Sequence, residues 1–190
     1  MTPAPLASPS MAWSMLAPPG WQRRRASELI EQNPLAAFEQ QARDAGRADL
    51  VLQARSLSAE LRSGLREGKV IELYLPGTLA AAEAAPASLS LALYRASEGT
   101  TPEAAVARMA KARPVERIDD AGAMHLRFRA ESSRYAKEGV HASHTMALFP
   151  RPDGAVGLFA TFTALHDGSG AETILTLGDV MLASLTWRTT

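Results

Sequence analysis

The chain has 190 residues, no cysteine, and 20 basic against 20 acidic residues. This length suits a single domain of about 100–200 residues. Without cysteine, a disulfide scaffold, a thiol nucleophile and cysteine-ligated metal sites are excluded. The balanced charge argues against general nucleic-acid binding, which needs a basic surface. No apolar run approaches the roughly 18 residues of a membrane-spanning helix.

Composition also indicates an origin. Alanine occupies 36 positions, and 17 of the 20 basic residues are arginine. GC-rich codons produce this pairing, so we expect a high-GC bacterium. The first basic residue is Arg23, whereas a secretory signal places basic residues before its apolar stretch. A cytoplasmic location is therefore expected.

The N-terminal segment is rich in proline. Five of the twelve prolines lie within Met1–Gly20, and proline is unsuited to helix interiors and central strands. We therefore predict a flexible arm over residues 1–22, followed by a single domain over residues 23–190. Trp13 and Trp21 either pin this arm to the domain or serve as aromatic anchors for a partner.

A long helix is predicted after the arm. Asn33-Pro34 is a helix-start signal. From Arg47 onward, apolar residues recur three or four positions apart, and Gly68 ends the stripe. The stripe consists of Leu50, Ala54, Leu57, Leu61 and Leu65. We expect this helix to cover the apolar face of a sheet.

The second half predicts strands, with helices at about 101–112 and 172–183. The expected strands cover residues 70–75, 88–95, 115–119, 124–133, 140–149 and 156–165, with a last short one at 184–188. Sequential hairpins favour an antiparallel sheet. The fold class is therefore α+β, with an antiparallel sheet of about six strands packed with helices.

Two segments carry a family resemblance. The closing segment Ile174–Trp187 ends a helix in Ser184-Leu185 before a final strand, and Pro18-Pro19-Gly20-Trp21 stands near the start. Both features are similar to PsbP-like domains, which include the Mog proteins and PsbP-like proteins of actinobacteria. The resemblance covers element order over about residues 70–188. It implies an antiparallel sheet between helical layers and a binding or accessory role without shared catalytic residues.

Known catalytic and metal-binding motifs are missing from the sequence. His141 and His144 are three apart on a predicted strand, so they point to opposite faces and do not share one ion. His166-Asp167 with Ser169 suits a helix-capping loop. We expect no metal site, no cofactor and no catalytic residues.

Pairing the last three long strands predicts a polar sheet face. We pair Ala130 with His144 in the first hairpin and His144 with Phe162 in the second, which makes one face almost entirely apolar. The opposite face then gathers Arg127, Arg129, His141, Ser143, Thr161 and Thr163, with Glu131 and Thr145. This face is either ordinary solvated sheet or a docking surface for an anionic partner.

The function predicted from the sequence is that of a non-enzymatic binding or accessory protein whose partner is another protein. Two alternatives stay open. One is a small enzyme with an unrecognised polar active site. The other is a structural module that self-associates through the 47–67 helix, as a homodimer.

Overall fold

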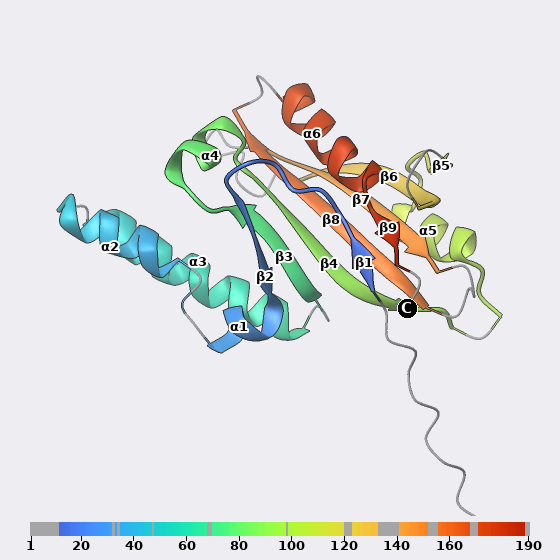
Figure 1. Ribbon diagram of the computed structural model, residues 1–190, viewed down its shortest axis with the longest axis horizontal. Coiled ribbons are helices and arrows are strands. Elements are labelled where there is room, and N and C mark those ends of the chain that lie inside the picture. The colour runs from blue at the N-terminus through green and yellow to red at the C-terminus, as the bar shows by residue number, and fades with distance from the viewer. Residues whose placement is uncertain are drawn as a thin grey trace, which may run out of the picture.

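The architecture is a helix-flanked antiparallel sheet, seen in a computed structural model (Figure 1). The model describes residues 12–31, 33, 35–46, 48–67, 70–97, 99–119, 123–132, 141–151, 156–167 and 171–188. The predicted α+β class and the antiparallel sheet are confirmed.

The main sheet has seven strands among the described residues, in the order β2-β3-β4-β8-β7-β6-β5, and each pairs antiparallel with its neighbour. Its strands are β2 Trp21–Arg25, β3 Val70–Pro76, β4 Ala87–Arg95, β5 Glu116–Ile118, β6 His125–Ser132, β7 His141–Pro150 and β8 Val156–His166. A separate ribbon pairs β1, Trp13–Ser14, with β9, Thr186–Trp187. The six strands expected between residues 70 and 165 are therefore present, and β2 is an additional strand.

Helices cover both faces of this sheet. They are α1 Ala26–Glu31, α2 Ala36–Asp44, α3 Ala48–Glu67, α4 Leu79–Ala84, α5 Pro102–Ala110 and α6 Ala171–Ala183. One face, which we call the α6 face, packs against α6 and the β1–β9 ribbon. On the other face, which we call the α5 face, α5 packs on β6 and β7, and α1 packs on β3.

The core centres on Phe162 of the α6 face, which is fully buried. The helix α6 approaches this ring at Gly178, where an added Cβ would lie 2.5 Å from Phe162 Cδ1. Trp21 stacks on the same ring, with centroids 6.5 Å apart and planes 7° apart. One side chain therefore joins the sheet, the C-terminal helix and the N-terminal segment.

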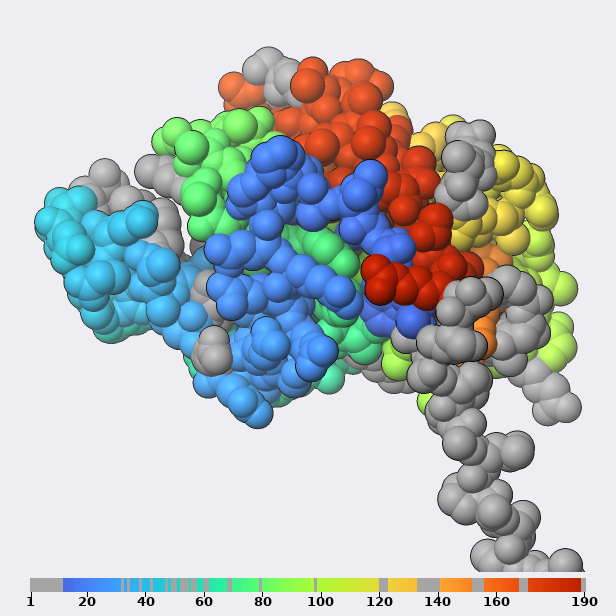
Figure 2. Space-filling view, viewed as in Figure 1, coloured from blue at the N-terminus to red at the C-terminus, as the bar shows by residue number. Residues whose placement is uncertain are grey.

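The long helix α3 packs chiefly against other helices in the described part of the structure. Its neighbours are α2 and α1, and the α2–α3 pair projects beyond β2 at one end of the molecule (Figures 1 and 2). Leu65, in its last turns, is buried with Leu29 of α1 and Leu73 of β3. The side chains of the other four stripe residues lie outside the described part of the structure. Cover of the apolar face by this helix is therefore not shown, and α6 lies over that face.

Local signals account for the elements that the sequence pattern missed. Thr78 caps α4 by accepting a hydrogen bond from the Ala81 backbone N–H at 3.2 Å. The strand β2 was not expected, and it straddles the predicted boundary between the arm of residues 1–22 and the domain of residues 23–190. Its backbone pairs with β3 from Trp21 to Arg25. An arm boundary at residue 22 would therefore fall inside a strand, while residues 1–11 lie outside the described residues.

The contact of Gly178 with Phe162 predicts a stability effect. Gly178→Ala should lower the free energy of unfolding by about 1–3 kcal/mol, because overpacking outweighs the gain in helix propensity. Gly64→Ala in α3 is the matched control, since its new Cβ meets nothing within 4 Å, and it should be neutral or stabilising by up to about 1 kcal/mol. Urea denaturation measures both. Equal effects of the two variants would contradict the packing.

Candidate binding site

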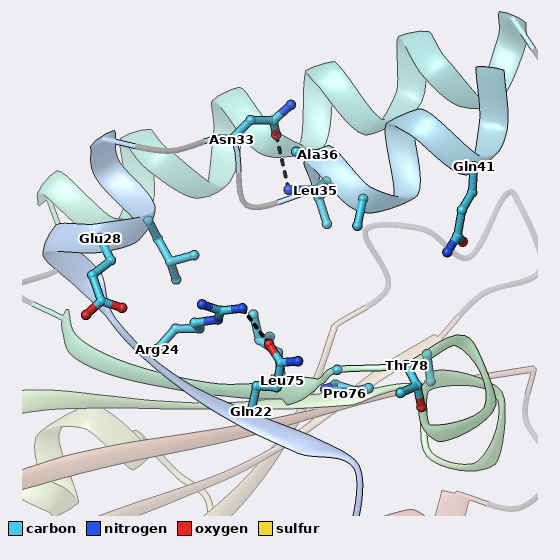
Figure 3. Close-up of a pocket in the computed structure, with 14 residues that line it drawn as sticks. Gln22, Arg24, Glu28, Asn33, Leu35, Ala36, Gln41, Leu75, Pro76 and Thr78 are labelled. Carbon is cyan, nitrogen blue, oxygen red and sulfur yellow. Dashed lines mark hydrogen bonds between the residues drawn. The ribbon is translucent and has the colours of Figure 1, made fainter. Parts of the chain in front are cut away.

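A cleft of about 500 Å³ opens between α1–α2 and the β2–β3 edge of the sheet (Figure 3). Its upper wall comes from α1, α2 and the segment between them. Its lower wall comes from β2, β3 and the start of α4. The residues that line it are Gln22, Arg24, Glu28, Leu29, Asn33, Leu35, Ala36, Ala37, Gln41, Leu75, Pro76, Gly77, Thr78 and Ala82.

The cleft combines apolar walls with a polar rim. Apolar side chains face each other across it, with Leu35 above and Leu75 below (Figure 3). Gln22 and Arg24 rise from β2 into the opening, and Arg24 Nη2 donates to Gln22 Oε1 at 2.6 Å. Gln41 projects downward from α2. Half of the polar side chains in the lining, those of Gln22, Asn33 and Gln41, are amides, which can both donate and accept hydrogen bonds.

Alternation along β2 places these side chains in the cleft. Successive residues of a strand point to opposite faces, so Gln22 and Arg24 lie on the α5 face. Arg23 points to the α6 face, where it forms an ion pair with the buried Glu72. Tyr74 Oη donates to the same carboxylate at 3.4 Å. Burial and the neighbouring Glu72 raise the pKa of Tyr74.

A buried carboxylate holds the upper wall in place. Glu39 of α2 accepts from Arg43, from Arg55 Nε of α3 at 2.8 Å and from Asn33 Nδ2 at 2.9 Å. These partners hold the pKa of Glu39 below its ordinary value, chiefly through the hydrogen bond from Arg55. The same Asn33 accepts at Oδ1 from Ser58 Oγ at 2.7 Å and from the Leu35 N–H at 3.1 Å. This network ties α2 to α3.

The predicted polar face is divided between the two faces of the sheet. The first hairpin has the predicted register, with Ala130 opposite His144. In the second hairpin, His144 lies opposite Thr163 rather than Phe162. That prediction was wrong by one residue, and a one-residue slip moves a whole strand's side chains to the other face. Thr161 and Thr163 therefore lie on the α5 face, away from Arg127 and Arg129.

The slip has an identifiable cause. The turn between β7 and β8 was placed from proline and glycine alone, and residues 152–155 lie outside the described part of the chain. Alternation in β8 is also ambiguous, because Phe159 and Leu158 are both apolar neighbours. Phe159 packs with the α5 cluster, while Leu158 packs with the α6 cluster. Both faces of β8 are thus partly apolar, so hydrophobic pattern could not select the register.

Arg127 and Arg129 lie beside α6 and pair with its Asp179. Arg127 Nη1 lies 2.9 Å from Asp179 Oδ1, and Arg129 Nη2 donates to Oδ2 at 2.6 Å. Arg127 also donates to Glu116 of β5 at 2.6 Å, and this contact lowers the pKa of Glu116. The Arg127 side chain is 18% exposed. The pair therefore helps to hold α6 and β5 to the sheet.

His141 and Ser143 lie on the α6 face at the start of β7. The Ser143 Oγ and His166 Nε2 atoms are 2.9 Å apart, and the His141 ring stacks on His166 at 5.8 Å between centroids. The 2.9 Å distance is that of a serine hydroxyl next to a histidine that acts as a general base. Ser143, however, is buried. Neither side chain lines the cleft beneath α2. On the other face, His144 Nδ1 lies 3.0 Å from Thr163 Oγ1, and burial lowers the pKa of His144.

Both predicted tryptophan anchors pack against the α6 face. Trp13 lies opposite Trp187 in the β1–β9 ribbon, and Trp21 stacks on Phe162. Each is partly buried against the main core cluster. This placement agrees with the interpretation that the tryptophans pin the N-terminal segment to the domain. A role in partner binding is a separate prediction that the packing does not test.

No model of a known protein family matches the chain, and no curated protein matches its sequence. The PsbP-like resemblance therefore stays a prediction. Among the helices that the structure describes, none is long and apolar enough to cross a membrane. Nor does the described part of the chain bring three His, Asp or Glu side chains together around one possible metal position.

Sequence reasoning missed the cleft. None of its lining residues was a candidate, because the wall residues come from segments predicted to be an arm, a helix and a loop. The run from Gln22 to Arg25 is polar at every position, so no alternation marked it as a strand. Asn33-Pro34 was predicted to start a helix, whereas α2 begins at Ala36 with Leu35 at its N-cap. The hydrogen bond from Ser58 to Asn33 depends on a contact 25 residues away, which a local pattern does not reveal.

The placement of the arginine pair predicts a loss of stability on charge reversal. An exposed docking surface would tolerate Arg127→Glu with Arg129→Glu, whereas this pair faces Asp179 and Glu116. We expect the double variant to lose about 1–3 kcal/mol of unfolding free energy. The control is Arg95→Glu, at an exposed position of β4. A parent-like melting temperature for the double variant would contradict the ion-pair arrangement.

The network around Glu39 predicts an acid-sensitive upper wall. A carboxylate whose folded pKa is lowered stabilises the fold above its unfolded pKa, and that contribution disappears as pH falls through the folded value. Amide resonances of α2, followed by NMR from about pH 7 to pH 3, should shift toward unfolded positions at the acid end. Glu39→Gln should show loosened α2 already at pH 7, whereas Glu31→Gln, at an exposed position of α1, should resemble the parent. Unchanged α2 in Glu39→Gln would refute this role.

Proposed function

We propose that the protein is a non-enzymatic binding or accessory protein that holds an extended segment of another protein in the cleft beneath α2. The observation that supports this is the lining of the cleft: apolar walls between Leu35 and Leu75, with amide groups at the rim. A volume near 500 Å³ lies in the range of about 300–1,000 Å³ usual for ligand pockets. The apolar walls would bury one or two side chains of the bound segment.

The polar groups suit a peptide backbone. The Gln22 and Gln41 side chains project into the opening from opposite walls (Figure 3), and each amide can match a backbone N–H and a backbone C=O. Arg24 and Glu28 stand at the α1 end of the cleft. An acidic side chain of the segment would meet the Arg24 guanidinium, which is exposed. A cytoplasmic location and a PsbP-like origin stay predictions beside this one.

A blocking substitution tests the proposal. Peptides are selected from a displayed random library on the intact protein, and their dissociation constants are measured by fluorescence anisotropy. Ala37→Trp places an indole at the lining of the cleft and should weaken binding at least about tenfold, equivalent to roughly 1.4 kcal/mol. The matched control is Ala59→Trp, at an exposed alanine of α3 that is not part of the lining.

Two results would contradict the proposal. One is the selection of peptides that bind the parent and Ala37→Trp equally, which would place binding elsewhere. The other is failure of the library to yield any peptide with micromolar affinity. Melting curves of both tryptophan variants establish that the protein remains folded.

A further inference from the structure

Among the described residues, the outer edge of β6 is paired along only part of its length. The strand runs from His125 to Ser132, but β5 pairs with it only at Arg127, Leu126 and His125. The strand β5 begins at Glu116, and Pro114 just before it has no backbone N–H to donate to a sheet. A cavity of about 470 Å³ lies there, lined by Arg113, Pro114, Glu116, Arg127, Phe128, Arg129, Ala130 and Glu131.

An edge of this kind is a template for another strand. Its outward N–H and C=O groups can pair with any extended chain that reaches them. The segment from Phe128 to Glu131 borders the cavity, and its far side is already paired with β7. Val115, just before β5, is apolar and 38% exposed. The end of the sheet thus offers backbone groups, an open slot and an apolar neighbour.

The charges on this edge are self-complementary. Arg129 and Glu131 are two residues apart, so they lie on the same face of the sheet, and both are exposed. Arg129 also donates to Asp179 of α6, yet its side chain remains 43% exposed. Two copies of β6 that run antiparallel around a two-fold axis through Ala130 would place Arg129 of each copy opposite Glu131 of the other. Opposite charges at directly facing positions stabilise a strand pair, and like charges destabilise it.

Neighbouring registers lose this match. In a continuous sheet, side chains at directly opposite positions lie on the same face. The pairing of the two β6 strands can therefore slide only in steps of two residues. An axis through Arg129 would bring the two Arg129 side chains together, and an axis through Glu131 would bring the two Glu131 side chains together. Within the described residues Glu131 has no ion-pair partner of its own. The axis through Ala130 therefore satisfies a charge that the single chain leaves exposed.

We propose that a second copy of this chain pairs with the open part of β6, antiparallel and centred on Ala130, to form a two-fold dimer with one continuous sheet. In a two-fold dimer, the same surface of each copy forms the interface. Only about five residues of each strand take part, so the buried area falls below the roughly 1,200 Å² of standard interfaces. The dimer is therefore weak and concentration-dependent. The hairpin of α2 and α3 lies at the other end of the molecule (Figure 1), so the dimer leaves the cleft open.

A cysteine substitution tests the axis directly, because the chain has no cysteine. Ala130→Cys brings two introduced thiols face to face, and the Cα separation of about 4.5–5.5 Å for facing antiparallel residues lies within disulfide range. Mild oxidation should link most of the protein as dimer on a non-reducing gel. The control is Arg24→Cys on β2, the opposite edge strand, which should stay monomeric. Equal crosslinking of both variants, or none of either, would overturn the proposal.

A charge exchange tests the register. Glu131→Arg places arginine opposite Arg129, and Arg129→Glu places glutamate opposite Glu131, so each variant alone should sediment as monomer where the parent dimerises. An equimolar mixture restores both opposite-charge pairs and should regain the dimer. Analytical ultracentrifugation from about 1 µM to 1 mM covers weak association. A parent that stays monomeric throughout, or variants that dimerise like the parent, would show that the edge serves another partner or none.

Discussion

The seating of α6 on Phe162 is the contact on which the arrangement of this protein depends. Glycine at position 178 lets the helix axis come so close that a Cβ would overlap the ring, and the indole of Trp21 stacks on the same ring. Close approach buries Leu175, Met181 and Leu182 against the sheet. Because the N-terminal segment shares this ring, β2 is held to the sheet although it consists largely of arginine. The lower wall of the cleft is built on that strand, so the site depends on a contact made on the opposite face.

The two faces of the sheet are covered differently, and this difference creates the cleft. The α6 face carries a continuous apolar core, closed by α6 and the β1–β9 ribbon. The α5 face instead has two separate clusters, one under α5 and one under α1. Among the described side chains, Leu29 of α1 and Leu65 of α3 join this helix pair to β3. The helix α2 stands above the β2–β3 edge, and the buried Glu39 network ties it to α3.

Much of the fold could be predicted from periodicity, because each of the strands β6, β7 and β8 and the helices α5 and α6 contains a complete local pattern. The register of β6 on β7 was also predictable, since alternation in β6 leaves one face apolar. The register of β7 on β8 was not, because Leu158 and Phe159 are both apolar and both buried or half-buried on opposite faces. The cleft escaped prediction for a related reason. Its walls come from chain segments about 50 residues apart, and the polar network that positions them joins side chains from different helices, which local spacing does not encode.

The distribution of charge separates the two ends of the molecule. At the β5–β6 end, Arg127 pairs with Glu116 and Asp179, and Arg129 pairs with Asp179 as well, while the side chains of Arg129 and Glu131 are exposed. At the α2 end, the cleft is lined by amides with one arginine and one glutamate. In the proposed dimer the two clefts lie at the far ends of one extended sheet. Each would bind its segment independently, so a partner with two such segments would gain affinity only if its linker spanned that distance.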